Sequence, residues 1–95
     1  MEKKAELAAQ IDRARWDWLK AHNERGGLII VDRTLDLAEV GERLAADDAA
    51  LVGRWMASRL LGKPTAEDVA GWNGAPDREF RVLIISPFVL MQELE

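Results

Sequence analysis

The most informative absence in this 95-residue sequence is that of cysteine. Without cysteine the chain can form no disulfide, no cysteine-ligated zinc or iron–sulfur site, and no thiol nucleophile. Motifs for nucleotide binding are lacking as well, because the pair Gly26-Gly27 is followed by neither a GxGxxG nor a GxxxxGK[ST] pattern. The sequence therefore offers no cysteine-based chemistry and no recognisable nucleotide-binding loop.

Long apolar runs and an excess of basic charge are also missing. The first ten residues, MEKKAELAAQ, lack the apolar segment of a signal peptide, and no run reaches the ~18–20 residues of a membrane span. Thirteen basic and seventeen acidic residues give a net charge of −4, and the basic residues are scattered. Nucleic-acid binding scales with the number of phosphates neutralised, so this chain is a poor candidate. We expect a cytoplasmic protein with neither a membrane nor a nucleic acid as partner.

What is present is enough apolar sequence for one folded domain over residues 1–95. The apolar content of 48% is ordinary for a globular protein. A chain this short buries only roughly 60–65% of its unfolded surface, so association with a second copy would add stability.

Helical periodicity covers much of the chain. The first predicted helix spans residues 2–23, where apolar residues recur at spacings of three and four: Leu7, Ile11, Ala14, Trp18 and Ala21. A second helix begins at Asp36, which stands at capping-box spacing from Glu39. Residues 49–61 continue as helix, and Thr65 caps a further short helix.

Two segments predict strands, over residues 28–32 and 80–85. Both are apolar at nearly every position, so both faces of the sheet are expected to be covered. The tail that follows is ambiguous, because Ser86-Pro87 is typical of a helix start, while residues 88–91 can equally continue as a strand. We favour a short terminal helix. The fold class is therefore α+β, with about four helices packed on a small sheet.

Three polar residues are candidates for a functional site. His22, the only histidine, suits a general base or a pH switch, or else a cap at its helix C-terminus. Asp47 and Asp48 suggest a metal or acid–base site, but adjacent positions on a helix point about 100° apart. Capping of a helix–helix junction is the simpler interpretation for both aspartates.

Aromatic and apolar residues indicate an interface instead. Trp18, Trp55 and Trp72 lie on the apolar sides of predicted helices, but Trp16 points away, among Asp12, Arg13 and Lys20. An exposed tryptophan is typical of a binding hot spot. Phe88 and Met91 belong to an apolar block at the chain end that needs cover. Trp16, Phe88 and Met91 are the predicted interface residues.

Several segments carry a resemblance to a known family. The order W-x-W-L-x-x-H, GGLIIVD, LDLAEVGERLAADDAALV-x-x-W, P-x-x-x-x-x-x-x-W and F-x-x-LI-x-x-PFVLMQE resembles the bacterial family catalogued as domain of unknown function 2288, over nearly the whole chain. The resemblance implies a small single-domain bacterial protein with no assigned activity. It carries over no catalytic residue, but Asp47, Asp48, Gln92 and Glu93 lie in its motif-like segments.

The leading hypothesis is a non-enzymatic interaction module that self-associates as a dimer or binds another protein, without a cofactor. The alternative is a small-ligand or metal-dependent enzyme or binder that uses Asp47, Asp48 and His22. It requires these side chains to converge in a pocket.

Overall fold

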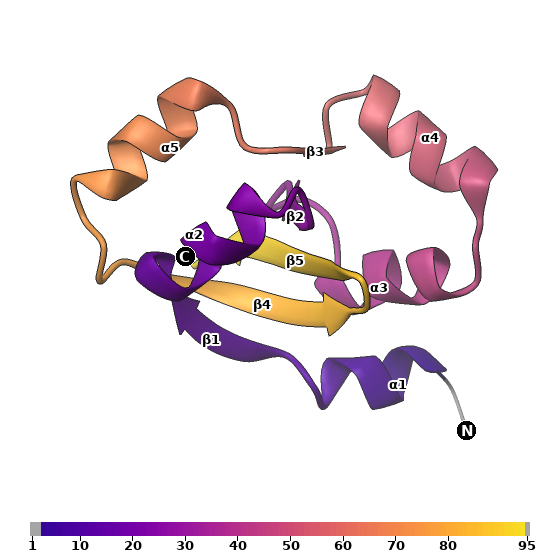
Figure 1. Cartoon of the computed structure of the whole chain (residues 1–95). Coiled ribbons are helices and arrows are strands. Elements are labelled where there is room, and N and C mark those ends of the chain that lie inside the picture. Colours follow the sequence, from indigo (N-terminus) through magenta and orange to yellow (C-terminus); the bar gives the residue numbers. More distant parts are fainter. Residues whose placement is uncertain (1–2, 95) are drawn as a thin grey trace.

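The structure, a computed structural model that describes residues 3–94, is a five-stranded sheet with helices on both faces (Figure 1). Its elements in chain order are α1 Lys3–Ala8, β1 Asp12–Arg15, α2 Trp16–Glu24, β2 Leu28–Val31, α3 Leu37–Ala45, α4 Ala49–Ala57, β3 Leu61–Gly62, α5 Ala66–Asn73, β4 Glu79–Ile85 and β5 Phe88–Glu93. The predicted α+β class is confirmed.

The strands lie side by side in the order β1-β4-β5-β2-β3. Neighbouring strands are antiparallel except β2 and β5, which run parallel with Leu28 opposite Val89. The two predicted strands correspond to β2 and β4. The sheet is larger than predicted because β1, β3 and β5 complete it.

The favoured prediction of a terminal helix is wrong, and the alternative of a strand is right. Beyond the turn at Ser86-Pro87, which contains a cis peptide bond, the chain returns as β5. This strand is central rather than at an edge, since it pairs with β4 on one side and with β2 on the other. The strand is stabilised by backbone pairing on both sides and by the burial of four consecutive residues. These non-local interactions outweigh the local preference of Ser86-Pro87 for a helix start.

The single helix predicted over residues 2–23 is also wrong, and its first residue, Glu2, lies outside the described part. Two short helices, α1 and α2, are separated by β1, which pairs with β4. The apolar residues of this region recur at helical spacing, but this spacing does not reflect a helix over Asp12–Arg15, which form β1. Because α2 begins only at Trp16, its phase differs from that of the predicted helix, and Trp16 and Leu19 face the sheet.

One face of the sheet, called here the α3 face, packs against α1 and α3, with α4 at its margin. Its buried residues form one cluster: Leu7, Val31, Leu37, Ala38, Val40, Leu61, Leu83 and Leu90. Within α3, Leu37, Val40 and Gly41 are buried, whereas Leu44 is half-buried.

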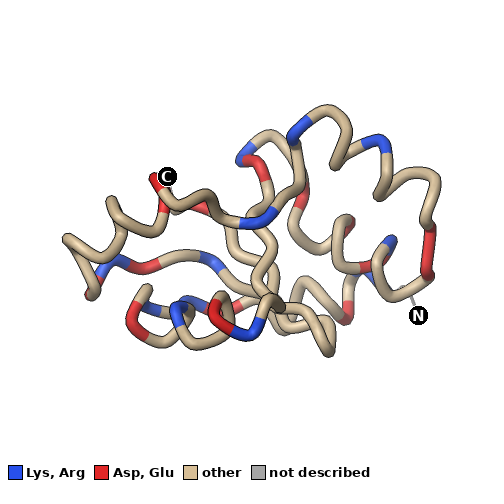
Figure 2. The backbone as a smooth tube through the Cα atoms, turned by 45° about the horizontal axis from the view of Figure 1, so that its top comes forward, with Lys and Arg blue, Asp and Glu red and all other residues tan. Residues whose placement is uncertain are grey.

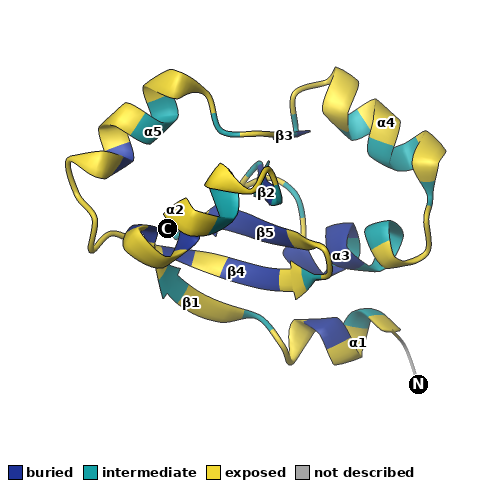
Figure 3. Cartoon of the chain, viewed as in Figure 1, coloured by how far each residue is buried: buried dark blue, intermediate teal, exposed yellow. Residues whose placement is uncertain are grey.

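The opposite face, called the α2 face, packs against α2 and α5. Its buried cluster contains Trp16, Leu19, Leu28, Trp72, Phe80, Val82, Val89 and Met91. Figure 3 shows buried positions concentrated in the central strands and exposed positions along the outer helices. The expectation that both faces are covered holds only in part, because Ile84 on this face is 52% exposed.

Local hydrogen bonds fix the helix starts as predicted. Asp36 Oδ1 accepts from the N–H groups of Ala38 and Glu39, and the Thr65 hydroxyl and the Asp68 carboxylate form a reciprocal capping box. The helix predicted over 49–61 is shorter than expected. It ends at Ala57, and β3 begins four residues later.

Candidate interaction surface

Trp16, the first predicted interface residue, is a core residue. Its side chain is completely buried, and its indole Nε1–H donates to Asn73 Oδ1 at 2.9 Å. The ring lies 4.8 Å from Trp72, which in turn contacts Phe80 edge-on at 5.3 Å. The prediction of an exposed Trp16 is wrong because it used the phase of a continuous helix that β1 interrupts.

Met91 is likewise buried, at 1% exposure, so it cannot act as an interface residue in this fold. It lies on β5 and joins the cluster of the α2 face. Phe88, the third predicted residue, is 36% exposed at the start of the same strand. Of the three predicted interface residues, only Phe88 lies at the surface.

Trp18 is the exposed tryptophan that the sequence patterns assigned to the core. Its side chain is 45% exposed and stacks at a tilt on His22, with 4.4 Å between the ring centres. A helix that starts at Trp16 places Trp16 and Leu19 inward and Trp18 on the flank. The exposure of Trp18 could therefore be predicted only from the position where α2 begins, and that position depends on the pairing of β1 with β4.

Trp18 forms one wall of an open hollow of about 610 Å³ between α2 and β1. The floor is apolar and is formed by Ala14, Val82 and Ile84 from β1 and β4. The polar side chains around it are Gln10, Asp12, Arg13, Arg15 and Asp17.

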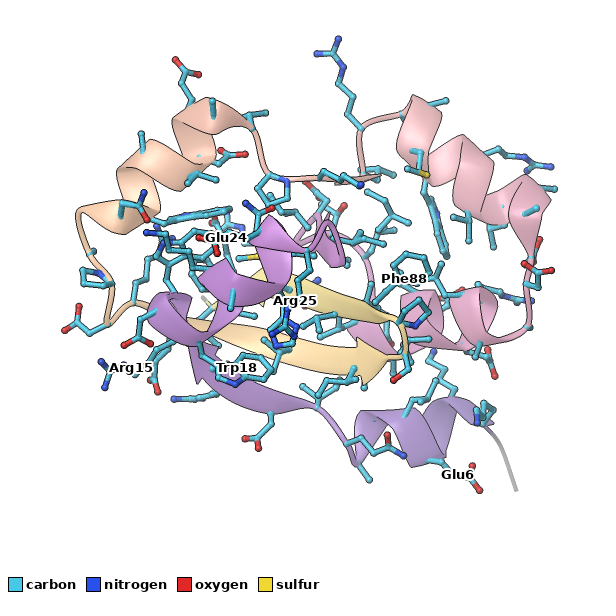
Figure 4. All side chains as sticks on the ribbon, viewed as in Figure 1. Glu6, Arg15, Trp18, Glu24, Arg25 and Phe88 are labelled. Carbon is cyan, nitrogen blue, oxygen red and sulfur yellow. The ribbon has the colours of Figure 1, made fainter. Side chains whose placement is uncertain are left out.

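A second hollow of about 380 Å³ follows along α2 toward the β4–β5 turn. Ile84 lines both hollows, so the two adjoin at this residue. Other residues of the second hollow include His22, Arg25, Pro87 and Phe88. Figure 4 labels Trp18, Arg25 and Phe88 around this part of the molecule. We call the set Trp18, His22, Arg25, Ile84, Pro87 and Phe88 the Trp18 surface.

Two of the charged groups beside Trp18 form an ion pair, and a third accepts a backbone hydrogen bond. Arg15 Nη2 lies 2.8 Å from Asp17 Oδ2, and Asp12 Oδ1 accepts from the Arg13 backbone N–H at 2.8 Å. Figure 2 shows acidic and basic positions interspersed along the chain rather than a continuous basic stripe. The hollow therefore lacks a set of unpaired polar groups that converge on one point.

The predicted polar site does not assemble. Asp48 Oδ1 accepts from Leu51 N–H as the cap of α4, and Oδ2 lies 3.7 Å from Arg43. Asp47 is exposed with a left-handed φ of 58°, between α3 and α4. His22 lies in α2 against Trp18. Within residues 3–94, no three histidine, aspartate or glutamate side chains are arranged to hold a metal ion.

Two other carboxylates show perturbed pKa values, and both have local structural causes. Hydrogen bonds from the hydroxyl and the N–H of Thr34 lower the pKa of Asp32. Burial raises the pKa of Asp36, but hydrogen bonds from Glu39 N–H and Lys4 outweigh it, so the pKa lies below its ordinary value. Neither group lines the Trp18 surface.

Gln92 and Glu93, which lie in a motif-like segment, have structural contacts. The buried Gln92 amide donates from Nε2 to the carbonyl oxygens of Asp32 and Leu35, at 3.0 and 2.8 Å. It thereby ties the loop after β2 to the central strand. Glu93 Oε1 lies 3.8 Å from Arg78 at the surface.

No helix in the described part of the chain is long and apolar enough to cross a membrane. None of the curated proteins matches the chain. A solved structure is similar over almost its full length: the NMR solution structure of PA1075 from Pseudomonas aeruginosa. The two share 31% sequence identity and superpose with a TM-score of 0.83, over 96% of this chain and 83% of PA1075. The family model for proteins of unknown function DUF2288 matches residues 2–93, and the chain belongs to that family.

Proposed function

We propose that this domain is a non-enzymatic interaction module that self-associates in solution. The observation that carries the proposal is the grouping of exposed apolar residues around the two hollows beside α2. Among residues 3–94, four large apolar side chains are exposed, and three of them, Trp18, Ile84 and Phe88, belong to the Trp18 surface. A contiguous exposed apolar patch with a polar rim is typical of an interaction site.

The composition of this surface supports a protein partner over a small ligand. Tryptophan is enriched among the residues that contribute most to protein–protein binding. The hollow beside Trp18 has a volume found among small-molecule sites, but Arg15 and Asp17 pair with each other instead of pointing at a common ligand. His22 and Ser86 line the second hollow, and no hydrogen bond joins them to form a nucleophile–base pair.

Local charge supports a second copy as the partner. The rim of the larger hollow carries two acidic residues, Asp12 and Asp17, and two basic residues, Arg13 and Arg15. It is neutral although the chain as a whole has a net charge of −4. Two copies can therefore meet at this place without the repulsion that acidic parts of the surface would impose.

The edge strand β1 is protected against pairing with another copy. Trp16 N–H bonds to Arg78 O, so the alternate residues Arg13 and Arg15 turn their backbone groups outward. The outward N–H of Arg13 is already bonded to the Asp12 carboxylate. Antiparallel pairing of two copies would also place these arginines opposite one another, which is unfavourable. Association through the face of the fold is favoured over extension of the sheet.

The alternative, a metal-dependent or small-ligand binder built on Asp47, Asp48 and His22, gains no support from this arrangement. Asp48 caps α4, and His22 lies on a different element against Trp18. A ligand site would need these groups to converge.

Sedimentation velocity tests the proposal. We expect the weight-average sedimentation coefficient of the purified protein to rise from the monomer value toward the dimer value between low and high micromolar concentration. A coefficient that stays at the monomer value throughout this range would overturn self-association.

A further inference from the structure

We infer that two copies associate through the Trp18 surface about a two-fold axis, with Arg25 of each copy packed on Trp18 of the other. The inference rests on the proposed self-association and specifies where it takes place.

The first argument is the alignment of residues on α2. Trp18, His22 and Arg25 are spaced by four and three residues, so they lie along one flank of the helix. Trp18 lines the larger hollow, His22 and Arg25 line the second one, and Ile84 lines both. Trp18 and Arg25 are about 10 Å apart along the helix axis. The flank therefore has an aromatic ring near its start and a cation at its end.

Because of this order, the flanks of two α2 helices are complementary when the helices run antiparallel. If two α2 helices pack antiparallel about an axis near His22, each Trp18 ring lies opposite Arg25 of the partner subunit. A guanidinium over an indole face is a favourable cation–π contact. A parallel arrangement would instead place the two Arg25 side chains together, which is repulsive.

Arg25 is available for this contact. The side chain is exposed, and none of the four ion pairs among residues 3–94 includes it. Arg15, on the rim of the larger hollow, is by contrast paired with Asp17 at 2.8 Å. Among the residues of the Trp18 surface, Arg25 is therefore a cation without an ion-pair partner, about 10 Å along the helix axis from the exposed Trp18.

The apolar residues beside the flank supply the buried centre of the contact. Ile84 is 52% exposed between the two hollows, and Phe88 lies beyond it. Side chains of a second copy would fill both hollows and remove these groups from water. A standard interface buries about 800 Å² per partner, and a few exposed apolar residues form only part of that area. We therefore expect a weak dimer in the micromolar range.

Within the described residues 3–94, Met56 is the exposed large apolar residue outside this surface, and it provides a matched control. It is 51% exposed on α4, with Gly53 and Ala57 as its exposed neighbours. Truncation of Trp18 and truncation of Met56 each remove an exposed apolar side chain, but only the former lies on the proposed interface.

The test measures dimer dissociation constants by sedimentation equilibrium. We expect Trp18→Ala to weaken association by about thirtyfold or more, as for a tryptophan hot spot, and Met56→Ala to change it by less than about twofold. Wild-type protein that stays monomeric contradicts the proposed function itself. A wild-type dimer that Met56→Ala weakens, or that Trp18→Ala leaves intact, overturns only this inference.

Charge reversal separates the cation–π contact from general electrostatics. Arg25→Glu and Arg54→Glu change the net charge equally, and each removes a cation from the end of a helix. We expect Arg25→Glu to weaken the dimer at least about tenfold more than Arg54→Glu does. Equal weakening by both variants would show that only total charge matters, and would refute the Arg25–Trp18 pairing.

A dilution series followed by NMR gives an independent readout. The indole N–H of Trp18 should shift with protein concentration, whereas that of Trp16, buried and bonded to Asn73, should not. A dimer in which the Trp18 signal stays constant would place the interface elsewhere.

Discussion

The two faces of the sheet differ in how completely helices cover them. On the α3 face, α1 and α3 lie close enough that Leu83 of β4 is completely buried. On the α2 face, the next residue of the same strand, Ile84, is 52% exposed, although its cross-strand neighbour Val89 is buried; β1 pairs with β4 only as far as Val82, which leaves Ile84 at an uncovered corner of this face. The helices of this chain therefore leave part of the apolar surface of the sheet, at Ile84, exposed to solvent. The uncovered part is where a partner gains most by binding.

The largest expected effect contrasts the covered and open halves of the α2 face. Trp16→Ala should destabilise the fold by about 3–5 kcal/mol, since it removes a fully buried ring and its hydrogen bond to Asn73. Trp18→Ala, two residues away, should reduce monomer stability by less than about 1 kcal/mol. Urea unfolding at a concentration where the protein is monomeric measures both. Similar losses for the two variants would mean that the open half is as tightly packed as the covered half.

The next effect concerns how the α3 face is closed. Gln92→Leu removes the donor to the carbonyl oxygens of Asp32 and Leu35, and leaves both without that partner beside a buried strand. We expect a loss of about 1–3 kcal/mol in the free energy of unfolding. Gln10→Leu, an exposed position, serves as the control. A Gln92 variant as stable as this control would show that water replaces the lost donor.

Features determined by neighbouring residues could be predicted from the sequence. The caps at Asp36, Asp48 and Thr65 follow from short-range patterns, and so does the apolar strand β2. The edge strand β1 could not be predicted in this way, because Asp12–Arg15 has the composition of an exposed helix segment. Its strand conformation comes from pairing with β4, more than 60 residues later in the chain.

The candidate surface was harder to predict than the fold for a related reason. A shift in the helix start exchanges Trp16 and Trp18, which are two positions apart and point to opposite sides. The exposed tryptophan was therefore assigned to the core and the buried one to the interface. The prediction that Trp16 is exposed and Trp18 lies on the apolar side is therefore wrong for both residues, because which of the two is exposed depends on the non-local pairing of β1.

A pair of glycines sharpens the contrast between a tightly packed helix and a loosely packed one. A Cβ on Gly41 of α3 would lie 2.6 Å from Leu83 Cδ2, whereas one on Gly53 of α4 would have no neighbour within 4 Å. Gly41→Ala should therefore destabilise the fold by about 1–2 kcal/mol, since the buried Leu83 has little room to move. Gly53→Ala should stabilise it by about 0.5–1 kcal/mol through helix propensity. Thermal unfolding distinguishes the two, and stabilisation by both would show that α3 is not in close contact with β4.

The smallest expected effect concerns the contact that holds α1 on the α3 face. Lys4 Nζ lies 3.3 Å from Asp36 Oδ2, both about half exposed, and Asp36 also caps α3. Asp36→Asn keeps a capping oxygen but removes the charge, so at pH 7 we expect a loss of only about 0.5 kcal/mol.

The pH dependence of this loss follows from the lowered pKa of Asp36 in the folded state. A carboxylate whose pKa is lowered in the folded state contributes its full stabilisation at pH values above its pKa in the unfolded state, which is about 4. This contribution disappears as the pH falls through the pKa of the folded state. Wild type and Asp36→Asn should therefore differ at pH 7 and converge in acid, with Asp77→Asn as an exposed control. A difference that persists at the lowest pH, or that grows there, would mean that the cap geometry rather than the charge joins α1 to the start of α3.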